Sequence, residues 1–125
     1  MPTQWRKIYI LVNNAGSGVT DKLMQNANVD DWDVIIDTNV KGLLYVTNFV
    51  LDSMVQFNSG HIINIGSSAV DGYYKGGNVY CTSKHAVKAL TNSLRIDLSG
   101  SKIRVTQVHP GAVQTEFHSV RWGGE

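Results

Sequence analysis

A chain of 125 residues with 42% hydrophobic and 17% charged side chains supports one domain with one hydrophobic core, which we assign to residues 1–125. The formal net charge of +1 argues against a nucleic-acid partner, and the balanced composition argues against disorder and membrane insertion. Because Cys81 is the single cysteine, no internal disulfide can form, and we expect a cytoplasmic protein.

The first predicted element is a strand at residues 8–12, a continuous run of β-forming side chains. Such a run is typical of a strand buried on both faces of a parallel sheet, and it is too short for a signal or membrane segment. It ends at Asn13, Asn14, Ala15 and Gly16, where small residues would let a ligand approach and the amides could tie neighbouring strands together. An ordinary strand-ending turn explains the same letters.

Gly16, Ser17 and Gly18 follow this strand but do not form a dinucleotide-binding fingerprint. The third glycine is missing, and Asp21 places an anion where a pyrophosphate turn needs bare backbone amides. The sequence therefore predicts no phosphate-binding turn at this point.

The next element is a long helix for which Asp30 is the predicted N-cap, with apolar residues at steps of three and four as far as Met54. Asn39 falls inside this apolar stripe. An unsatisfied buried amide costs roughly 1 to 3 kcal/mol, so we expect a hydrogen-bond partner for Asn39. The pattern leaves a structural and a functional role equally open.

Two further strands are predicted at residues 60–66 and 103–108, separated by a loop at 69–78 and a helix from Val79 to Leu98 that Gly100 stops. The loop would form part of a substrate wall. Thr115 and Glu116 are expected to open a polar tail. The order strand, helix, strand, helix, strand predicts an α/β fold with a parallel sheet.

Three side chains after the second strand have the chemistry for proton transfer to a carbonyl oxygen. Tyr80 and Lys84 lie four residues apart, on one face of the predicted helix, and an ammonium beside a phenol favours the phenolate. Tyr80 could therefore act as general acid or base, while the Ser67 hydroxyl accepts from Tyr80 and donates to the same substrate oxygen. Neither group moves a hydride, so a cofactor is required. A solvated Tyr and Lys pair on a helix is the structural alternative.

A metal site is a competing possibility that the spacing disfavours. Cys81 and His85 stand at helical spacing, but His61, His109 and His118 lie elsewhere without the pair spacing of metal ligands. We therefore expect no metal site.

Taken together, five motifs in order and spacing resemble those of the short-chain dehydrogenase/reductase family over nearly the whole chain. They are Asn13-Asn14-Ala15-Gly16, Thr38-Asn39-Val40-Lys41-Gly42, Ser67, Tyr80-x-x-x-Lys84, and Pro110-Gly111 with Thr115. Residues 76–80, and Thr115-Glu116-Phe117 with Val120-Arg121, look most like the NADP-dependent 3-hydroxy acid and serine dehydrogenases of this family.

The resemblance implies an NAD(P)-dependent oxidoreductase that interconverts a small alcohol or hydroxy acid and its carbonyl, with NADP favoured. Tyr80 would be the general acid/base, Ser67 would orient the carbonyl, Lys84 would favour the tyrosinate and bind the nicotinamide ribose, and Asn39 would position a water. The cofactor-binding residues would be Asn13, Ala15, Gly16, Asn39, Tyr80, Lys84, Pro110, Gly111, Val113 and Thr115.

The chain departs from the family pattern before its first strand. Family members begin with a strand, a glycine-rich turn and two further βα units, so we expect a partial Rossmann-like, doubly wound three-layer sandwich lacking the first βαβαβ segment. The strand at residues 8–12 would then be an exposed apolar edge, which favours self-association. In the family the two long helices form the dimer contact, so we expect a homo-oligomer, a dimer or tetramer. The alternative is an inactive remnant that acts as a dimerising or binding module.

Overall fold

The computed structural model describes residues 6–113 and 115–122. Strands β1 (Ile10–Asn13), β2 (Gly60–Ile65) and β3 (Ile103–Val108) form a sheet in the order β1-β2-β3, and both neighbouring pairs are parallel. In this register Leu11 lies opposite Ile62, which lies opposite Val105. The predicted α/β class and parallel sheet are confirmed, and the predicted bounds of β2 and β3 hold to within one residue.

The connection from β1 to β2 is one long helix in three parts: α1 (Val29–Ile36), the π-helical segment η3 (Asp37–Gly42) and α2 (Leu43–Phe57). Asn28, and not the predicted Asp30, caps it, because the Asn28 side chain accepts from Asp30 N at 3.2 Å. Asp30 instead lies in the first turn, where the helix dipole favours an anion. The short 3-10 turn η2 (Met24–Asn26) precedes this helix.

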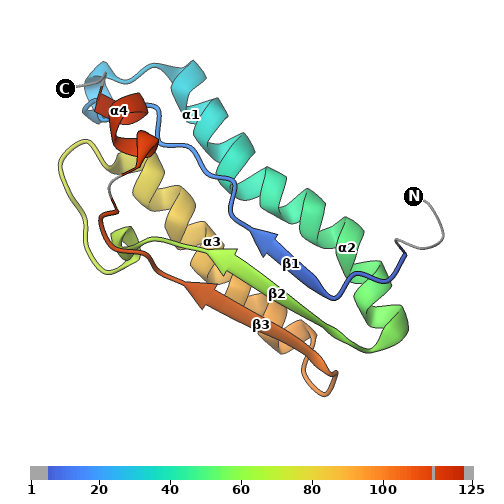
Figure 1. Cartoon of the computed structure of the whole chain (residues 1–125). Coiled ribbons are helices and arrows are strands. Elements are labelled where there is room, and N and C mark those ends of the chain that lie inside the picture. Colours follow the sequence, from blue (N-terminus) through green and yellow to red (C-terminus); the bar gives the residue numbers. More distant parts are fainter. Residues whose placement is uncertain (1–5, 114, 123–125) are drawn as a thin grey trace.

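The second connection contains the 3-10 turn η4 (Ser68–Val70) and the helix α3 (Asn78–Asp97). The predicted helix at this position is confirmed to within one residue at each end, and Gly100 follows it with a φ of 84°. The polar tail expected from Thr115 onward is wrong, since Glu116–Trp122 forms the helix α4. Figure 1 shows α4 beside the N-terminal ends of α1 and α3.

Helices α2 and α3 cover the same face of the sheet (Figure 1). The core between them is formed by Val50 and Met54 of α2 with Ile62 and Ile103 of the sheet. Leu94 and Leu98 of α3 pack against this cluster from the other side. Of the three layers of a complete sandwich, the described residues therefore build the sheet and one helical layer.

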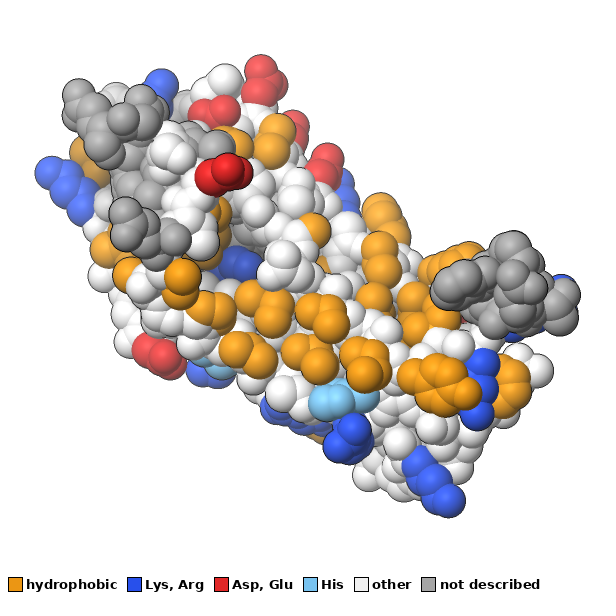
Figure 2. Space-filling view, viewed as in Figure 1, with side chains coloured by type: hydrophobic (Ala, Val, Ile, Leu, Met, Phe, Trp, Pro, Cys, Tyr) orange, Lys and Arg blue, Asp and Glu red, His pale blue; other side chains and the backbone are white. Residues whose placement is uncertain are grey.

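The opposite face of the sheet is open to solvent. Ile10 and Val12 of β1 are 59% and 52% exposed, and Val108 of β3 is 43% exposed. Figure 2 shows hydrophobic side chains running across this face. The prediction that the first strand is buried on both faces is therefore wrong for the described residues, because α2 and α3 both cover the other face of the sheet. The predicted position of β1 at the edge of the sheet is confirmed.

The helix over Val29–Phe57 is also long and apolar enough to span a membrane, since an 18-residue window of it has a mean hydropathy of 1.2. Its inner residues Thr47, Val50 and Met54 are buried, and the last two belong to the core against the sheet. Core helices of globular domains reach the same length and hydropathy, so this feature alone assigns no membrane location.

Candidate active site

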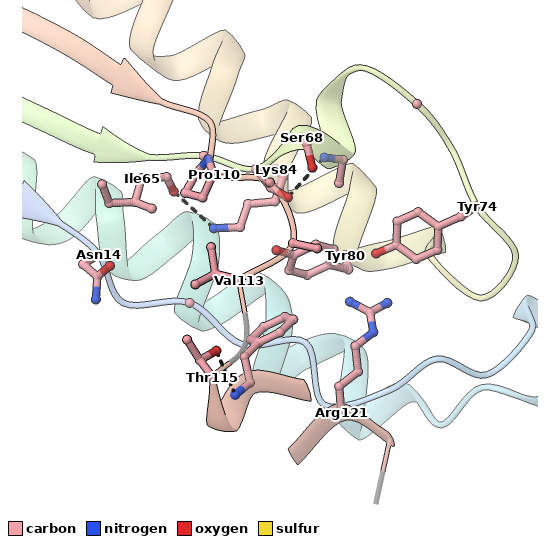
Figure 3. Close-up of a pocket in the computed structure, with 18 of the residues that line it drawn as sticks. Asn14, Ile65, Ser68, Tyr74, Tyr80, Lys84, Pro110, Val113, Thr115 and Arg121 are labelled. Carbon is pink, nitrogen blue, oxygen red and sulfur yellow. Dashed lines mark hydrogen bonds between the residues drawn. The ribbon is translucent and has the colours of Figure 1, made fainter. Parts of the chain in front are cut away.

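The candidate site lies where the three parallel strands end, because their carboxyl ends meet at one edge of the sheet. A cavity of about 620 Å³ opens there, lined by the segments that follow each strand and by α3 and α4 (Figure 3). Eight of the predicted catalytic and cofactor-binding residues line it: Gly16, Ser67, Tyr80, Lys84, Pro110, Gly111, Val113 and Thr115.

Tyr80 and Lys84 stand on one face of the N-terminal half of α3, as their spacing predicts. The Lys84 Nζ atom lies 5.9 Å from the centroid of the Tyr80 ring and donates a hydrogen bond to Ile65 O at 3.2 Å (Figure 3). Lys84 is only 5% exposed, and this burial lowers its pKa below the ordinary value of 10.5. The pair is thus buried at the cavity, which argues against a solvated helix face.

Ser67 follows β2 directly and lines the cavity with Tyr80. Its hydroxyl accepts from Ala69 N at 3.1 Å and so caps η4, and its carbonyl accepts from His109 Nδ1 at 3.0 Å. In the described part of the chain, the Ser67 hydroxyl is hydrogen-bonded to Ala69 N, and the predicted hydrogen bond from the Tyr80 hydroxyl to Ser67 is not formed. That bond stays a prediction for the protein with substrate.

Asn39 is buried in η3, 2% exposed, and connects the loop after β1 to helix α3. Its Nδ2 donates to Ser17 O and to Ser83 Oγ, both at 2.9 Å, while its Oδ1 accepts from Ser17 N at 2.7 Å. Ser83 in turn donates to Tyr80 O at 2.8 Å. The expected partners of this buried amide are therefore present. π-Helical turns inside α-helices recur at functional sites.

Asn13 lies off the cavity wall and ties strand β1 to its neighbours. Its Nδ2 donates to Asn64 Oδ1 at 2.8 Å and to Thr47 Oγ1 at 2.9 Å. Asn64 Nδ2 continues this network to Thr91 Oγ1 at 3.0 Å. The prediction that the amides tie strands together is thus confirmed for Asn13. Ala15 and Asn39, like Asn13, do not line the cavity.

The glycines after β1 serve close packing. A Cβ on Gly16 would lie 3.3 Å from Lys84 Nζ, and a Cβ on Gly18 would lie 2.6 Å from the Phe117 ring. Helix α4 therefore rests directly on the Gly18 backbone. This contact gives Gly18 a role that needs no phosphate.

The loop predicted to form part of a substrate wall does line the cavity, through Tyr74 among others. Phe117 and Arg121, which the sequence used only as marks of the narrower resemblance, line it as well. The Arg121 guanidinium carbon lies 4.7 Å from the Tyr80 ring centroid, 5.4 Å from that of Tyr74 and 6.0 Å from that of Phe117. Burial raises the pKa of Tyr74, and the Arg121 charge opposes that rise. The spacing of Phe117 and Arg121, four residues apart, is the signal that would have placed both on one helix face.

A phenol, a buried ammonium and a hydroxyl around one cavity can move a proton to or from a substrate oxygen. A sequence profile of the short chain dehydrogenases matches residues 1–123. The chain belongs to the short chain dehydrogenase family. Its Rossmann-like fold is confirmed by a serine dehydrogenase structure in closed form with NADP+, with a TM-score of 0.95, 49% identity, and coverage of 100% of this chain and 51% of the other.

Two curated relatives in this family carry more specific names. The NADP-dependent 3-hydroxy acid dehydrogenase YdfG of Salmonella typhi is 51% identical over 100% of this chain and 51% of its own length. The sulfoacetaldehyde reductase 2 of Chromohalobacter salexigens is 43% identical over 100% of this chain and 50% of its own length. The chain thus spans about half the length of the curated relatives that it matches.

Proposed function

We propose that this chain provides the proton-transfer residues and the nicotinamide end of the site of an NADP-dependent oxidoreductase. The reaction interconverts a small 3-hydroxy acid and its carbonyl compound. The observation that supports this most is the placement of Ser67, Tyr80 and Lys84 around one cavity, with Lys84 buried beside the Tyr80 ring. The names of the relatives supply the cofactor and the substrate class.

In the direction of reduction, the Tyr80 hydroxyl gives its proton to the substrate oxygen, and in oxidation the Tyr80 phenolate takes it back. The Ser67 hydroxyl donates to the same oxygen and holds it beside Tyr80. The Lys84 ammonium stabilises the negative charge left on Tyr80. NADP, when bound, supplies or accepts the hydride at the substrate carbon.

Asn39 acts one step away from the substrate in this proposal. Its hydrogen bonds to the Ser17 backbone and to Ser83 hold the loop after β1 against the turn of α3 that carries Lys84. We assign it the family role of positioning a water molecule for proton exchange.

The residues present fit the nicotinamide end of the cofactor. Gly16 leaves a space that a Cβ would fill next to Lys84 Nζ, and Gly111 is open on its Cβ side, with nothing within 4 Å. Gly16, Lys84, Pro110, Gly111, Val113 and Thr115 would border the nicotinamide and its ribose. The loop after β1 is occupied by contacts to Asn39 and α4, so it is not available as a pyrophosphate-binding turn.

Calorimetric titration of the purified chain with NADPH and with NADH tests this proposal. We expect NADPH to bind in the micromolar range and more tightly than NADH, and NADP+ reduction to follow when a 3-hydroxy acid is added. The absence of NADPH binding at millimolar concentration would overturn the proposal. It would favour the second candidate, a catalytically inactive dimerising or binding module.

We further propose a cytoplasmic homo-oligomer, a dimer or tetramer, without nucleic-acid or membrane partners. Tyr45 and Phe49 on α2 are 70% and 66% exposed, and the apolar edge strand β1 is open as well. Exposed apolar surface of this kind favours association between copies. Sedimentation velocity should show a dimer or larger species, and a monomer at high concentration would contradict this assignment.

A further inference from the structure

The cavity has a clear charge bias. The charged side chains among its described lining residues are Lys84 and Arg121, both cations, and no aspartate or glutamate lines it among those residues. Both cations are 5% exposed, so water screens their charge poorly. This bias favours an anionic ligand.

Arg121 comes from α4, and its guanidinium lies on the opposite side of Tyr80 from the Lys84 ammonium (Figure 3). The Tyr80 ring is 4.7 Å from the guanidinium carbon, and the Tyr74 and Phe117 rings complete an aromatic frame. Cations are stabilised over aromatic faces, and this frame restricts where the guanidinium can point. Gly18 lets the side chain lie this deep, since a Cβ there would come within 3.1 Å of Arg121 Nη1.

A planar guanidinium presents paired N–H donors that match the two oxygens of a carboxylate. Because Arg121 lies close to Tyr80, a substrate bound by both residues must be short, with its anionic group near its reacting oxygen. Two such anchors would also fix which end of the substrate faces Tyr80.

We propose that Arg121 binds the carboxylate of the substrate and makes the site selective for small hydroxy acids over neutral alcohols. This inference rests on the proposed function, because it assumes that the substrate oxygen lies at Tyr80. It adds the residue that recognises the acid, a role that the sequence analysis assigned to no residue.

The test compares 3-hydroxypropionate with its uncharged amide, 3-hydroxypropionamide, by NMR titration of the purified chain. Hydrogen bonds to charged groups contribute about 1.5–3 kcal/mol, so we expect the acid to bind about 10- to 100-fold more tightly than the amide. Arg121→Met should remove this preference, and Arg121→Lys should keep only part of it, since an ammonium lacks the paired donors. Arg104→Met, at an exposed arginine outside the cavity, is the matched control and should keep it.

A role of Arg121 confined to fastening α4 would weaken binding of the acid and the amide equally. Equal binding of the two by the wild-type chain, or a preference that survives Arg121→Met, would overturn the inference. Rates of NADP+ reduction separate it from the proposed function. If the chain binds the acid selectively but does not reduce NADP+, the carboxylate site is supported and the proposed oxidoreductase function is rejected. If it reduces NADP+ equally fast with the acid and the amide, the oxidoreductase function is supported and the carboxylate site is rejected.

Discussion

Replacing Asn39 with alanine should destabilise the fold through unsatisfied backbone groups. The substitution removes three hydrogen bonds, and it leaves Ser17 N and Ser17 O without the partners that Asn39 provides. Each buried unsatisfied group costs about 1–3 kcal/mol. Ser17 is half-buried, so water can partly replace the lost partner, whereas Ser83 keeps its bond to Tyr80 O. We therefore expect a loss of about 2–4 kcal/mol in the free energy of unfolding.

Urea unfolding followed by circular dichroism measures this loss, with an unchanged m-value as the sign that only stability has changed. Asn48→Ala is the matched control, because Asn48 is exposed on α2 and should change the stability by less than about 0.5 kcal/mol. An Asn39→Ala chain as stable as the Asn48→Ala chain would refute the assignment of Asn39 as the link between the β1 loop and α3.

Two further substitutions test the loop before α3 and the buried ammonium. Gly76→Ala should lower the free energy of unfolding by more than about 2 kcal/mol, because Gly76 has a φ of 78° and a Cβ would lie 1.9 Å from Asp21 O. Gly100→Ala is the control and should cost about 1 kcal/mol, because Gly100 has a similar φ of 84° but open space around it. Equal losses of stability in thermal unfolding would contradict this prediction. The folded pKa of Lys84 lies below 10.5, so between those two values the unfolded chain binds more protons and stability should rise with pH. Lys84→Met should flatten that rise, and parallel stability curves for the two proteins against pH would refute the burial argument.

The sequence was sufficient for the elements whose pattern is local. Strand β3 follows from its alternation of apolar and polar residues, and strand β2 from its isoleucine-rich sequence. Helix α3 follows from its apolar stripe and from the glycine at position 100. The prediction of Asp30 as N-cap was wrong because an asparagine two residues earlier can cap a helix equally well, and Asn28 does so. Only the backbone geometry, extended at Asn28, decides between them.

Features that depend on distant contacts were beyond the sequence. Helix α4 has seven residues, too few for an isolated helix to be stable, and it packs through Phe117 and Arg121 against Gly18 and Tyr80. The π-helical turn at Asn39 likewise depends on hydrogen bonds to Ser17 and Ser83, far away in the chain. The sequence identified the site residues to which a motif assigns a role. It gave Arg121 no place in the site, because the position of Arg121 beside Tyr80 depends on how α4 packs.

The most direct test of the proposed chemistry is the rate of NADP+ reduction by the purified chain with 3-hydroxypropionate, compared with that of Tyr80→Phe. General acid–base groups contribute about 10²–10⁴-fold to rate, so Tyr80→Phe should lower the rate at saturating NADP+ at least 100-fold. Tyr45→Phe removes the same hydroxyl from a 70% exposed tyrosine on α2 and should keep the wild-type rate. A Tyr80→Phe chain that reduces NADP+ at the wild-type rate would contradict the assignment of Tyr80 as the proton-transfer residue.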